Sequence, residues 1–215
     1  MRKSGYAAYE SFAAKRPGIQ LVGCWAHARR HFCDAGEHTP VRSGWTLKQI
    51  ANLYAIESRL RRTTACPKLR EIQRTAQSLP ILARIQRALQ KMAASGLHLP
   101  QSLFAKAIAY TLDNWKELTA YTANGRIEID NNLVENAIRP TALGKKNWLF
   151  IGHADAGQRS AIIYTVIESC RRRGIDPHAY LRDVLTRLPA ATNTMIPEFT
   201  PAAWAKARQP LPKAA

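Results

Sequence analysis

The sequence predicts a mainly α-helical protein with a few short strands. Between residues 46 and 122 apolar side chains recur at spacings of three and four, which is the periodicity of amphipathic helices. Three short runs, at residues 19–22, 126–129 and 148–151, instead have the length and the branched or alternating side chains of strands. A chain of 215 residues can bury a substantial core as one domain or two small ones, so we expect disorder only at its ends.

The N-terminal elements are expected to be a short helix, a strand and a second helix. The first helix, over residues 6–15, ends at Pro17-Gly18, and the apolar run 19–22 then has the features of a buried strand. A second helix is expected from about residue 26 to residue 34, followed by a loop over 36–44.

The central region is expected to contain only helices. Thr46 is a suitable N-cap for the first of them. Pro67 and Pro80 stand where the first turns of two further helices are expected. The second of these ends at Gly96, and Pro100 opens one more.

The pattern changes after the central helices. Asn124-Gly125 is a strong turn signal, and residues 126–129 alternate like a short strand. A short helix over 131–139 should end there because Pro140 disfavours a helical conformation in the residue before it. The apolar run 148–151 is the last expected strand.

Two helices are expected to complete the fold. The first ends at Gly174, with three arginines in its last turn where they complement the helix dipole. Asp176-Pro177 caps the second, and beyond Pro189 a tail rich in Ala, Pro and Thr is expected to be loosely held.

The charge of the chain indicates a polyanionic partner. Its 32 Lys and Arg stand against 15 Asp and Glu, a net charge of +17, and residues 41–100 alone hold 11 against 2. Such a cationic surface attracts nucleic acid above all, because it can follow a row of phosphates. An anionic membrane would call for a basic amphipathic helix or a lipidation signal, and neither stands out. An RNA-binding protein is disfavoured because no RNP, KH or GXXG signature appears.

The termini and the cysteines favour a cytoplasmic protein that does not enter a membrane. No signal-peptide-like apolar run follows the first residues, and no stretch approaches the roughly 20 residues that cross a bilayer. The four cysteines, at positions 24, 33, 66 and 170, lack the spacing of a disulfide framework. We therefore expect reduced thiols.

The helix expected over 131–139 carries the strongest candidate site. Glu135 lies four residues after Asn131 and four before Arg139, so the three side chains share one stripe. That stripe would suit a carboxylate ligand of Mg²⁺ beside a cation that reaches a phosphate. The alternative is an exposed ion pair between Glu135 and Arg139, worth a few tenths of a kcal/mol. The other face is apolar and consists of Leu133, Val134, Ala137 and Ile138.

A second cluster is formed by Cys24, His27 and His31, which share one face of their expected helix, with Cys33 close behind. Zinc would need four ligands, and one helix face usually supplies two, so other ligands would have to come from elsewhere. The simpler alternative is a buried cysteine and a hydrogen-bonded histidine that anchor the helix to the core.

A basic turn is expected over residues 144–148. Lys145 and Lys146 could contact phosphate there, while Trp148 packs inward or stacks on a base. The GxxxxGK[ST] spacing of a phosphate-binding loop is missing, so nucleotide hydrolysis is not predicted.

Five motifs in order resemble the insertion sequence 66 family of bacterial transposases over about residues 4–188. The motifs are GYAAY at 5–9, GCWAHARRHF at 23–32, IDNNLVENAIRP at 129–140, LGKKNWLF at 143–150 and GIDPHAYL at 174–181. The resemblance implies a DDE enzyme with an RNase H-like fold. In such enzymes two Asp and one Glu bind two divalent metals, Mg²⁺ or Mn²⁺, and direct water and then a DNA 3′-hydroxyl into phosphodiester bonds.

The resemblance also implies roles for individual residues. Glu135 matches the family's Glu and would be the catalytic metal ligand. Cys24-x-x-His27 is similar to a motif that, in related transposases, stands where an all-helical insertion begins. Contacts with double-stranded DNA are expected from Arg29, Arg30, Asn131, Asn132, Arg139, Lys145 and Lys146.

The resemblance divides the chain into four regions. Residues 1–39 would be part of an RNase H-like α/β core, interrupted by a helical insertion over 40–122 that grips DNA. Residues 123–188 would be the rest of the core with the Glu135 helix, and 189–215 a flexible tail.

Two departures from the family pattern limit the activity that we expect. Ser4 stands where the family has an Asp directly before the Gly-Tyr motif, and the other Asp belongs to strands that would precede residue 1. We therefore interpret the chain as the C-terminal portion of a DDE transposase that binds DNA but is inactive alone. The missing strands would expose sheet edges and apolar surface, which predicts poor solubility or association with another chain. The alternative is a non-catalytic DNA-binding or oligomerising modulator of a full-length transposase.

Overall fold

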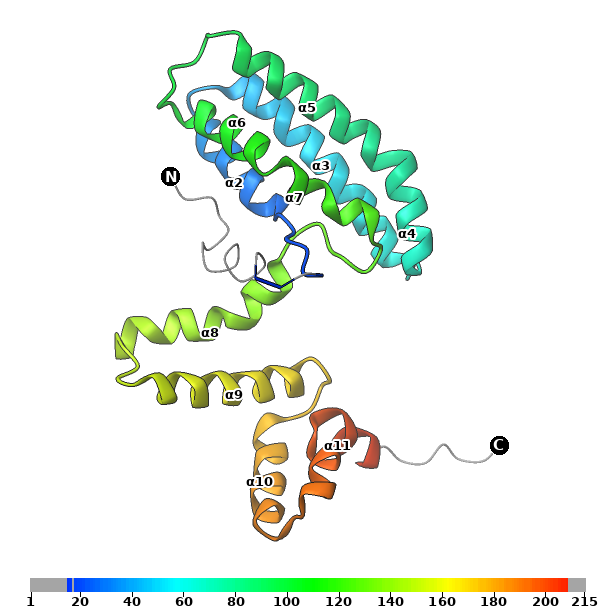
Figure 1. Ribbon diagram of the computed structural model, residues 1–215, viewed down its shortest axis with the longest axis vertical. Coiled ribbons are helices and arrows are strands. Elements are labelled where there is room, and N and C mark those ends of the chain that lie inside the picture. Colours follow the sequence, from blue (N-terminus) through cyan, green and yellow to red (C-terminus); the bar gives the residue numbers. More distant parts are fainter. Residues whose placement is uncertain (1–14, 17, 209–215) are drawn as a thin grey trace. The chain divides into compact units, whose positions relative to one another are not determined.

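The computed structural model describes residues 15, 16 and 18–208, and these residues contain helices and loops but no strand (Figure 1). They divide into two compact units, residues 1–133 and residues 134–215. Ser4, the motif at 5–9 and most of the helix expected over 6–15 lie outside the described residues.

The described part of the first unit consists of α-helices with one π-helical and one 3₁₀ segment. Their bounds are α2 (Trp25–Ala35), α3 (Pro40–Arg62), α4 (Pro67–Gln73), the π-helix η1 (Arg74–Ser78), α5 (Leu79–Ala94), α6 (Leu103–Asp113), α7 (Trp115–Thr119) and the 3₁₀ helix η2 (Ala120–Ala123).

The second unit contains the C-terminal helices, and its first helix begins at the boundary between the units. The bounds are α8 (Asn132–Trp148), α9 (Ala154–Arg171), α10 (Pro177–Arg187), the 3₁₀ helices η3 (Leu188–Ala190) and η4 (Asn193–Phe199), and α11 (Pro201–Arg208). Each described helix of either unit is too short or too polar to traverse a lipid bilayer.

The expectation of helices throughout the central region is confirmed, with different starting points for two of them. Pro67 and Pro80 occupy the first turns of α4 and α5 as predicted. The helix assigned to Thr46 begins earlier, at Pro40, and the Thr46 hydroxyl is buried and donates to the Arg42 carbonyl at 3.0 Å. The last helix begins after Pro100, at Leu103, where the Ser102 side chain caps it.

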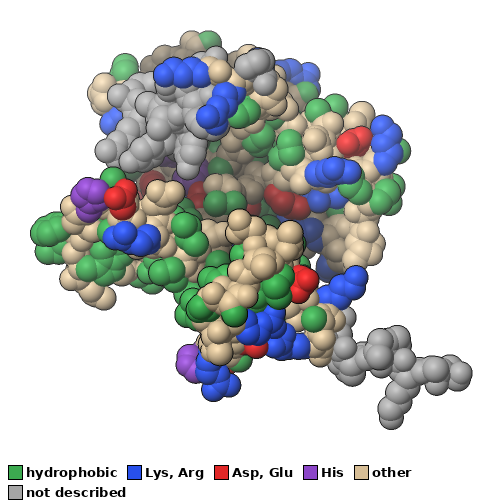
Figure 2. Space-filling model, turned by 60° about the horizontal axis from the view of Figure 1, so that its bottom comes forward, with side chains coloured by type: hydrophobic (Ala, Val, Ile, Leu, Met, Phe, Trp, Pro, Cys, Tyr) green, Lys and Arg blue, Asp and Glu red, His purple; other side chains and the backbone are tan. Residues whose placement is uncertain are grey.

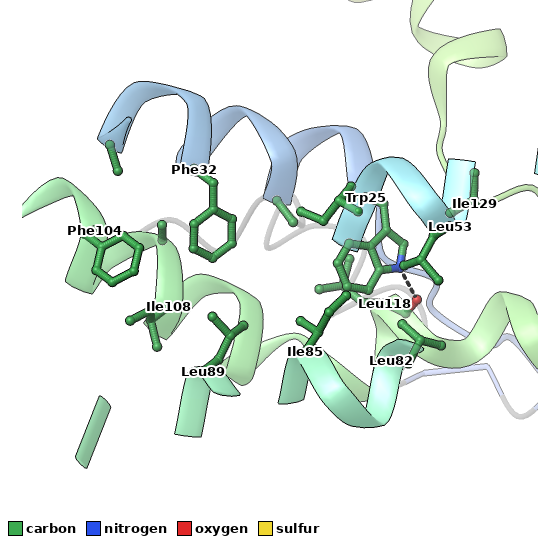
Figure 3. Packing of buried hydrophobic residues seen from close by; sticks show 14 of the residues in the cluster. Trp25, Phe32, Leu53, Leu82, Ile85, Leu89, Phe104, Ile108, Leu118 and Ile129 are labelled. Atoms are coloured by element: carbon green, nitrogen blue, oxygen red, sulfur yellow. Dashed lines mark hydrogen bonds between the residues drawn. The ribbon is translucent and has the colours of Figure 1, made fainter. Parts of the chain in front are cut away.

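A hydrophobic core joins these helices, with α2 packed against α3 and α6 (Figure 3). Trp25 is fully buried, and its indole N–H donates to the Leu118 carbonyl at 2.7 Å. Phe32 and Phe104 meet edge to face with 6.0 Å between ring centroids. The periodicity of the apolar residues thus places one face of each helix in this core.

A buried ion pair ties the same unit together through Glu57 of α3 and Arg74 of η1, both fully buried. The Arg74 guanidinium donates to both Glu57 carboxylate oxygens, at 2.8 and 2.7 Å. Its remaining donors reach three backbone carbonyls, and Arg70 donates to both Glu57 and Glu128. Burial alone would raise the pKa of Glu57, but Arg74 and Arg70 hold it below its ordinary value.

The carbonyls that Arg74 binds explain why the prediction of a strand over 126–129 is wrong. The Ile127 carbonyl accepts a hydrogen bond from the Arg74 guanidinium at 2.9 Å, and the Ile129 carbonyl accepts one from the Trp25 backbone N–H at 3.2 Å. These acceptors are used by a side chain and a helix start, not by a neighbouring strand. Residues 19–22 also form no strand, so the prediction of a strand there is wrong as well.

The RNase H-like α/β core is therefore not what the described residues form, and the predicted fold class is wrong. The third expected strand is missing for a local reason. The helix predicted to end before Pro140 continues through it to Trp148, and Ala142, Leu143, Lys145 and Lys146 in its second half are good helix formers. Leu149 then takes a left-handed conformation, with φ of 57°, which ends the helix.

The second unit has a small core at the C-terminal end of α9. Cys170, Tyr180 and Phe199 are buried there together with Ile175 and Val184. The Tyr180 hydroxyl donates to the Phe199 carbonyl, and the Trp204 indole N–H donates to Asp183 at 2.9 Å. Within the segment expected as a tail, residues 193–208 form η4 and α11 because these two contacts hold them on α10.

Candidate functional site

The candidate site is the segment IDNN, residues 129–132, which leads into α8. Within the first unit, residues at the start of α2 fix this segment by hydrogen bonds. The Trp25 N–H donates to the Ile129 carbonyl, and the Asn131 N–H donates to the Cys24 Sγ at 3.5 Å. Ile129 is fully buried and Cys24 is 9% exposed. The backbone at 129–131 is therefore fixed on the core directly before α8 begins.

Asp130 organises the first residues of α8. Its carboxylate accepts from the Asn132 backbone N–H at 3.2 Å and from the Asn132 amide at 2.9 Å. These bonds satisfy a backbone donor at the helix start and favour the negative charge there. Burial raises the pKa of the nearby Tyr54, and the Asp130 carboxylate raises it further.

The sequence allows two hypotheses for Cys24, His27, His31 and Cys33: a zinc site, and a buried cysteine with a hydrogen-bonded histidine that anchors the helix to the core. Cys24 is buried and accepts a backbone hydrogen bond, as an anchoring cysteine would. The His31 ring packs on Tyr110 with 4.5 Å between centroids, and burial lowers the pKa of His31. Cys33 is exposed. Within either unit taken by itself, the described residues bring no three His, Cys, Asp or Glu side chains within ligand distance of one another.

The expected DNA-contacting residues of the first unit lie on the surface. Arg29 and Arg30 are exposed on α2, and Asn131 and Asn132 are exposed at the start of α8. Long cationic side chains and short amides with free access to solvent suit phosphate contacts.

The other expected site residues lie along α8, in the second unit. Glu135 is half-buried in the first turn, and Arg139, Lys145 and Lys146 are exposed. Residues 4 and 11 positions apart on a helix share a face, so Glu135, Arg139 and Lys146 form one stripe that extends over roughly 16 Å. Because Pro140 does not end the helix, Lys145 and Lys146 lie in its last turn and not in the predicted basic turn.

Sequence reasoning missed two contributions to this region. The role of Cys24 as acceptor for the Asn131 N–H and the proximity of Tyr54 to Asp130 both depend on long-range contacts. The only signal in the sequence was the place of Cys24 directly before a predicted helix.

Comparison with known proteins gives the family. Residues 1–159 match the family described as "Transposase IS66 family", and residues 165–202 match the "IS66 C-terminal element". Since the first match alone covers well over half of the chain, the chain belongs to the IS66 transposase family. The resemblance found in the sequence motifs is thereby confirmed.

The curated relatives are uncharacterized proteins of Sinorhizobium fredii (strain NBRC 101917 / NGR234). The protein y4jD is 33% identical over 201 residues, which are 91% of this chain and 39% of y4jD. The protein y4qI is 34% identical over 198 residues, 87% of this chain and 35% of y4qI. This chain thus spans little more than a third of the length of these relatives. No solved structure matches it.

The family generally uses divalent metal. The question is therefore whether the described residues of this chain could bind such metal ions. A two-metal site needs several carboxylates that converge on two positions. Glu135 is the one metal-binding carboxylate that the resemblance assigns to this chain, and neither unit by itself gathers three ligands among its described residues. The described residues of one unit do not fit a two-metal site, and we derive no catalytic step from them.

Proposed function

We propose that this chain is the part of an IS66-family transposase that contributes Glu135 and a DNA-contacting surface, and that it is catalytically incomplete by itself. Membership of the family supports a role in transposition. The observation that carries the finer proposal is the stripe on α8, where a half-buried carboxylate precedes exposed cations on the same helix face. Glu135 would supply one ligand for Mg²⁺ or Mn²⁺. One Asp would come from the part of the family protein that this sequence does not match, and the position of the other Asp is held by Ser4, whose hydroxyl is a poor substitute for a carboxylate ligand.

The proposed partner is double-stranded DNA, and the proposed place of action is the cytoplasm, where bacterial DNA lies. The chain carries a net charge of +17, and the helices over residues 41–100 hold most of it. Lys and Arg neutralise phosphates and release counterions, which makes binding strong at low salt and weak at high salt. The helical region 40–122 would grip the duplex, and Arg139, Lys145 and Lys146 would lie on DNA beside Glu135.

Salt dependence tests DNA binding. If the three α8 cations each meet a phosphate, they alone should lower the affinity for duplex DNA about 40-fold between 50 and 200 mM KCl. Titration by fluorescence anisotropy should then show that Arg139→Gln/Lys145→Gln/Lys146→Gln reduces the slope of log affinity against log salt by about 2.7. The matched control removes three exposed cations that lie outside both the region 40–122 and α8, Arg126→Gln/Arg171→Gln/Lys206→Gln, and should change the slope by less than about 1. Equal slopes for the two triple variants would contradict the proposed surface.

Strand cleavage tests the incompleteness. The purified chain with Mg²⁺ or Mn²⁺ is expected to leave labelled duplex DNA uncut and unjoined, because a single matched carboxylate cannot hold two metals. Denaturing gels of a DNA fragment carrying the element's ends are the measurement. Metal-dependent cleavage that disappears in Glu135→Gln would show that the chain is a complete enzyme.

A second candidate function is modulation of a full-length transposase without catalysis, by occupying its DNA or joining its oligomer. The exposed apolar face of α8 favours this alternative, since such a face suits a protein contact. Co-purification with an intact family member after nuclease treatment would distinguish it from independent DNA binding.

A further inference from the structure

The helix α8 lacks a buried face. Its 17 residues include an apolar stripe opposite the Glu135 stripe, yet none of them is buried. Val134 is 52% exposed and Ile138 is 58% exposed. An isolated helix of this length is marginal in water, and most helices in proteins are stabilised by packing an apolar face. The fold of α8 therefore requires a partner for its apolar stripe.

The exposed apolar surface of the second unit continues beyond α8. Trp148, Leu149, Phe150 and Ile151 follow at its end, with Phe150 at 79% exposed, and Ile162 and Ile163 are exposed on α9. Only Cys170, near the end of α9, is buried in that helix. Hydrophobic side chains reach the surface in the face drawn in Figure 2. So many exposed large apolar residues in consecutive elements are typical of a protein interface.

We propose that this surface, formed by α8 and the first half of α9, binds the part of an IS66-family transposase that the present sequence does not match. The proposal rests on the proposed function, because it assumes that the chain acts within a larger transposase. Its occupant is argued from length: y4jD and y4qI are more than twice as long as this chain, so more than half of each protein lies outside the matched segment, and we assign that remainder as the partner.

Charge disfavours a second copy of this chain as the occupant. Residues 134–215 hold 12 Lys and Arg against 6 Asp and Glu, and each whole chain carries +17. A symmetric contact would bring these like charges together, which costs free energy and slows encounter. This repulsion between two identical positively charged chains does not apply to the unmatched part of the family protein, which has a different sequence.

Co-expression tests the proposal. The tagged chain is produced together with y4jD from which the 201-residue matched segment has been removed, and the complex is recovered by affinity purification without DNA or metal. We expect the truncated y4jD to be retained by the wild-type chain and at least tenfold less by Val134→Gln/Ile138→Gln. Glutamine keeps helix propensity, and both positions are exposed, so the variant should fold, which circular dichroism checks.

A matched variant and a second readout make the result decisive. Leu97→Gln/Leu99→Gln replaces two apolar residues of the first unit that are even more exposed than Val134 and Ile138, and it should retain truncated y4jD like the wild type. Hydrogen exchange of the α8 amides should be slowed by the partner at least tenfold. Absence of retention, or retention unchanged by Val134→Gln/Ile138→Gln, would overturn the proposal. So would a dimer of the chain that this variant converts to a monomer. Because DNA and metal are absent, failure here is separate from failure of the salt and cleavage tests.

Discussion

Replacing Glu57 by Gln is expected to lower the free energy of unfolding of the first unit by about 3–5 kcal/mol. The substitution leaves the fully buried Arg74 guanidinium without its charged partner, and a buried charge without compensation is costly. Arg70 loses one of its two carboxylate partners at the same time. Urea denaturation followed by circular dichroism measures the effect.

An exposed pair in the same unit supplies the control. Lys68→Gln removes a contact between Lys68 and Glu71 whose lysine is 81% exposed, so it should change stability by less than about 0.5 kcal/mol. Acid provides a second control. The pKa of Glu57 is lower in the folded chain than in the unfolded chain, so its contribution is complete above the unfolded value and is lost as the pH falls through the folded value. The stability of wild type and Glu57→Gln should therefore converge at low pH, and a difference that persists would mean that charge is not the cause.

The success of the helix predictions and the failure of the strand predictions have one physical origin. A helix satisfies its backbone hydrogen bonds within itself, so local periodicity, Pro67 and Pro80 were sufficient to place α4 and α5. A strand depends on partners elsewhere. The run at 126–129 has the composition of a strand, but its carbonyls are bound by Arg74 and Trp25.

The buried ion pair could not be predicted from the sequence for the same reason. Glu57 and Arg74 are 17 residues apart on different helices, and each reads as an ordinary surface charge of an amphipathic helix. The packing of α3 against η1 in the folded chain buries both Glu57 and Arg74. The cationic excess was therefore read correctly as a total, while Arg74, one of its members, is occupied inside the fold.

The candidate site was predictable to the extent that it is a linear motif. Asp130, Asn132 and Glu135 lie within one turn and a half of chain, so their association with the start of a helix followed from spacing. The support from Cys24 joins positions 107 residues apart and requires the folded core. The full length of α8 could not be predicted from the sequence, because Pro140 favours an end of the helix while the helix formers after it favour its continuation.

Gly125→Ala is expected to destabilise the first unit by roughly 3 kcal/mol, because it overfills a place where two backbone segments meet. A Cβ at Gly125 would lie 1.9 Å from the Pro67 carbonyl oxygen, and neither backbone is a flexible side chain that can move aside. The sequence marks Asn124-Gly125 as a strong turn signal, and a turn of this kind often places glycine at positive φ. Gly125 is not among the glycines with positive φ, so the requirement is for space and not for conformation.

Substitutions at two other glycines separate the steric effect of an added methyl group from its effect on backbone conformation. Gly44 lies inside α3, and a methyl group added there would meet no neighbouring atom within 4 Å, so Gly44→Ala should stabilise the helix by about 0.5–1 kcal/mol. Gly96 has φ of 65° and open surroundings, so Gly96→Ala should cost about 1 kcal/mol through conformation alone. A loss at Gly125→Ala no larger than that at Gly96→Ala would contradict the proposed contact.

The loop around Gly125 is also coupled to the buried ion pair. The Gly125 N–H donates to Glu71 at 3.1 Å, and the adjacent Asn124 carbonyl accepts from Arg74 at 2.9 Å. A displacement of the loop by an added methyl group would therefore weaken bonds that Glu57→Gln also disturbs. The double variant Glu57→Gln/Gly125→Ala should accordingly lose less stability than the two single variants added together, since residues of one network are not independent. Lys68→Gln/Gly44→Ala, which touches neither Glu57 nor Arg74, should be additive within about 0.5 kcal/mol.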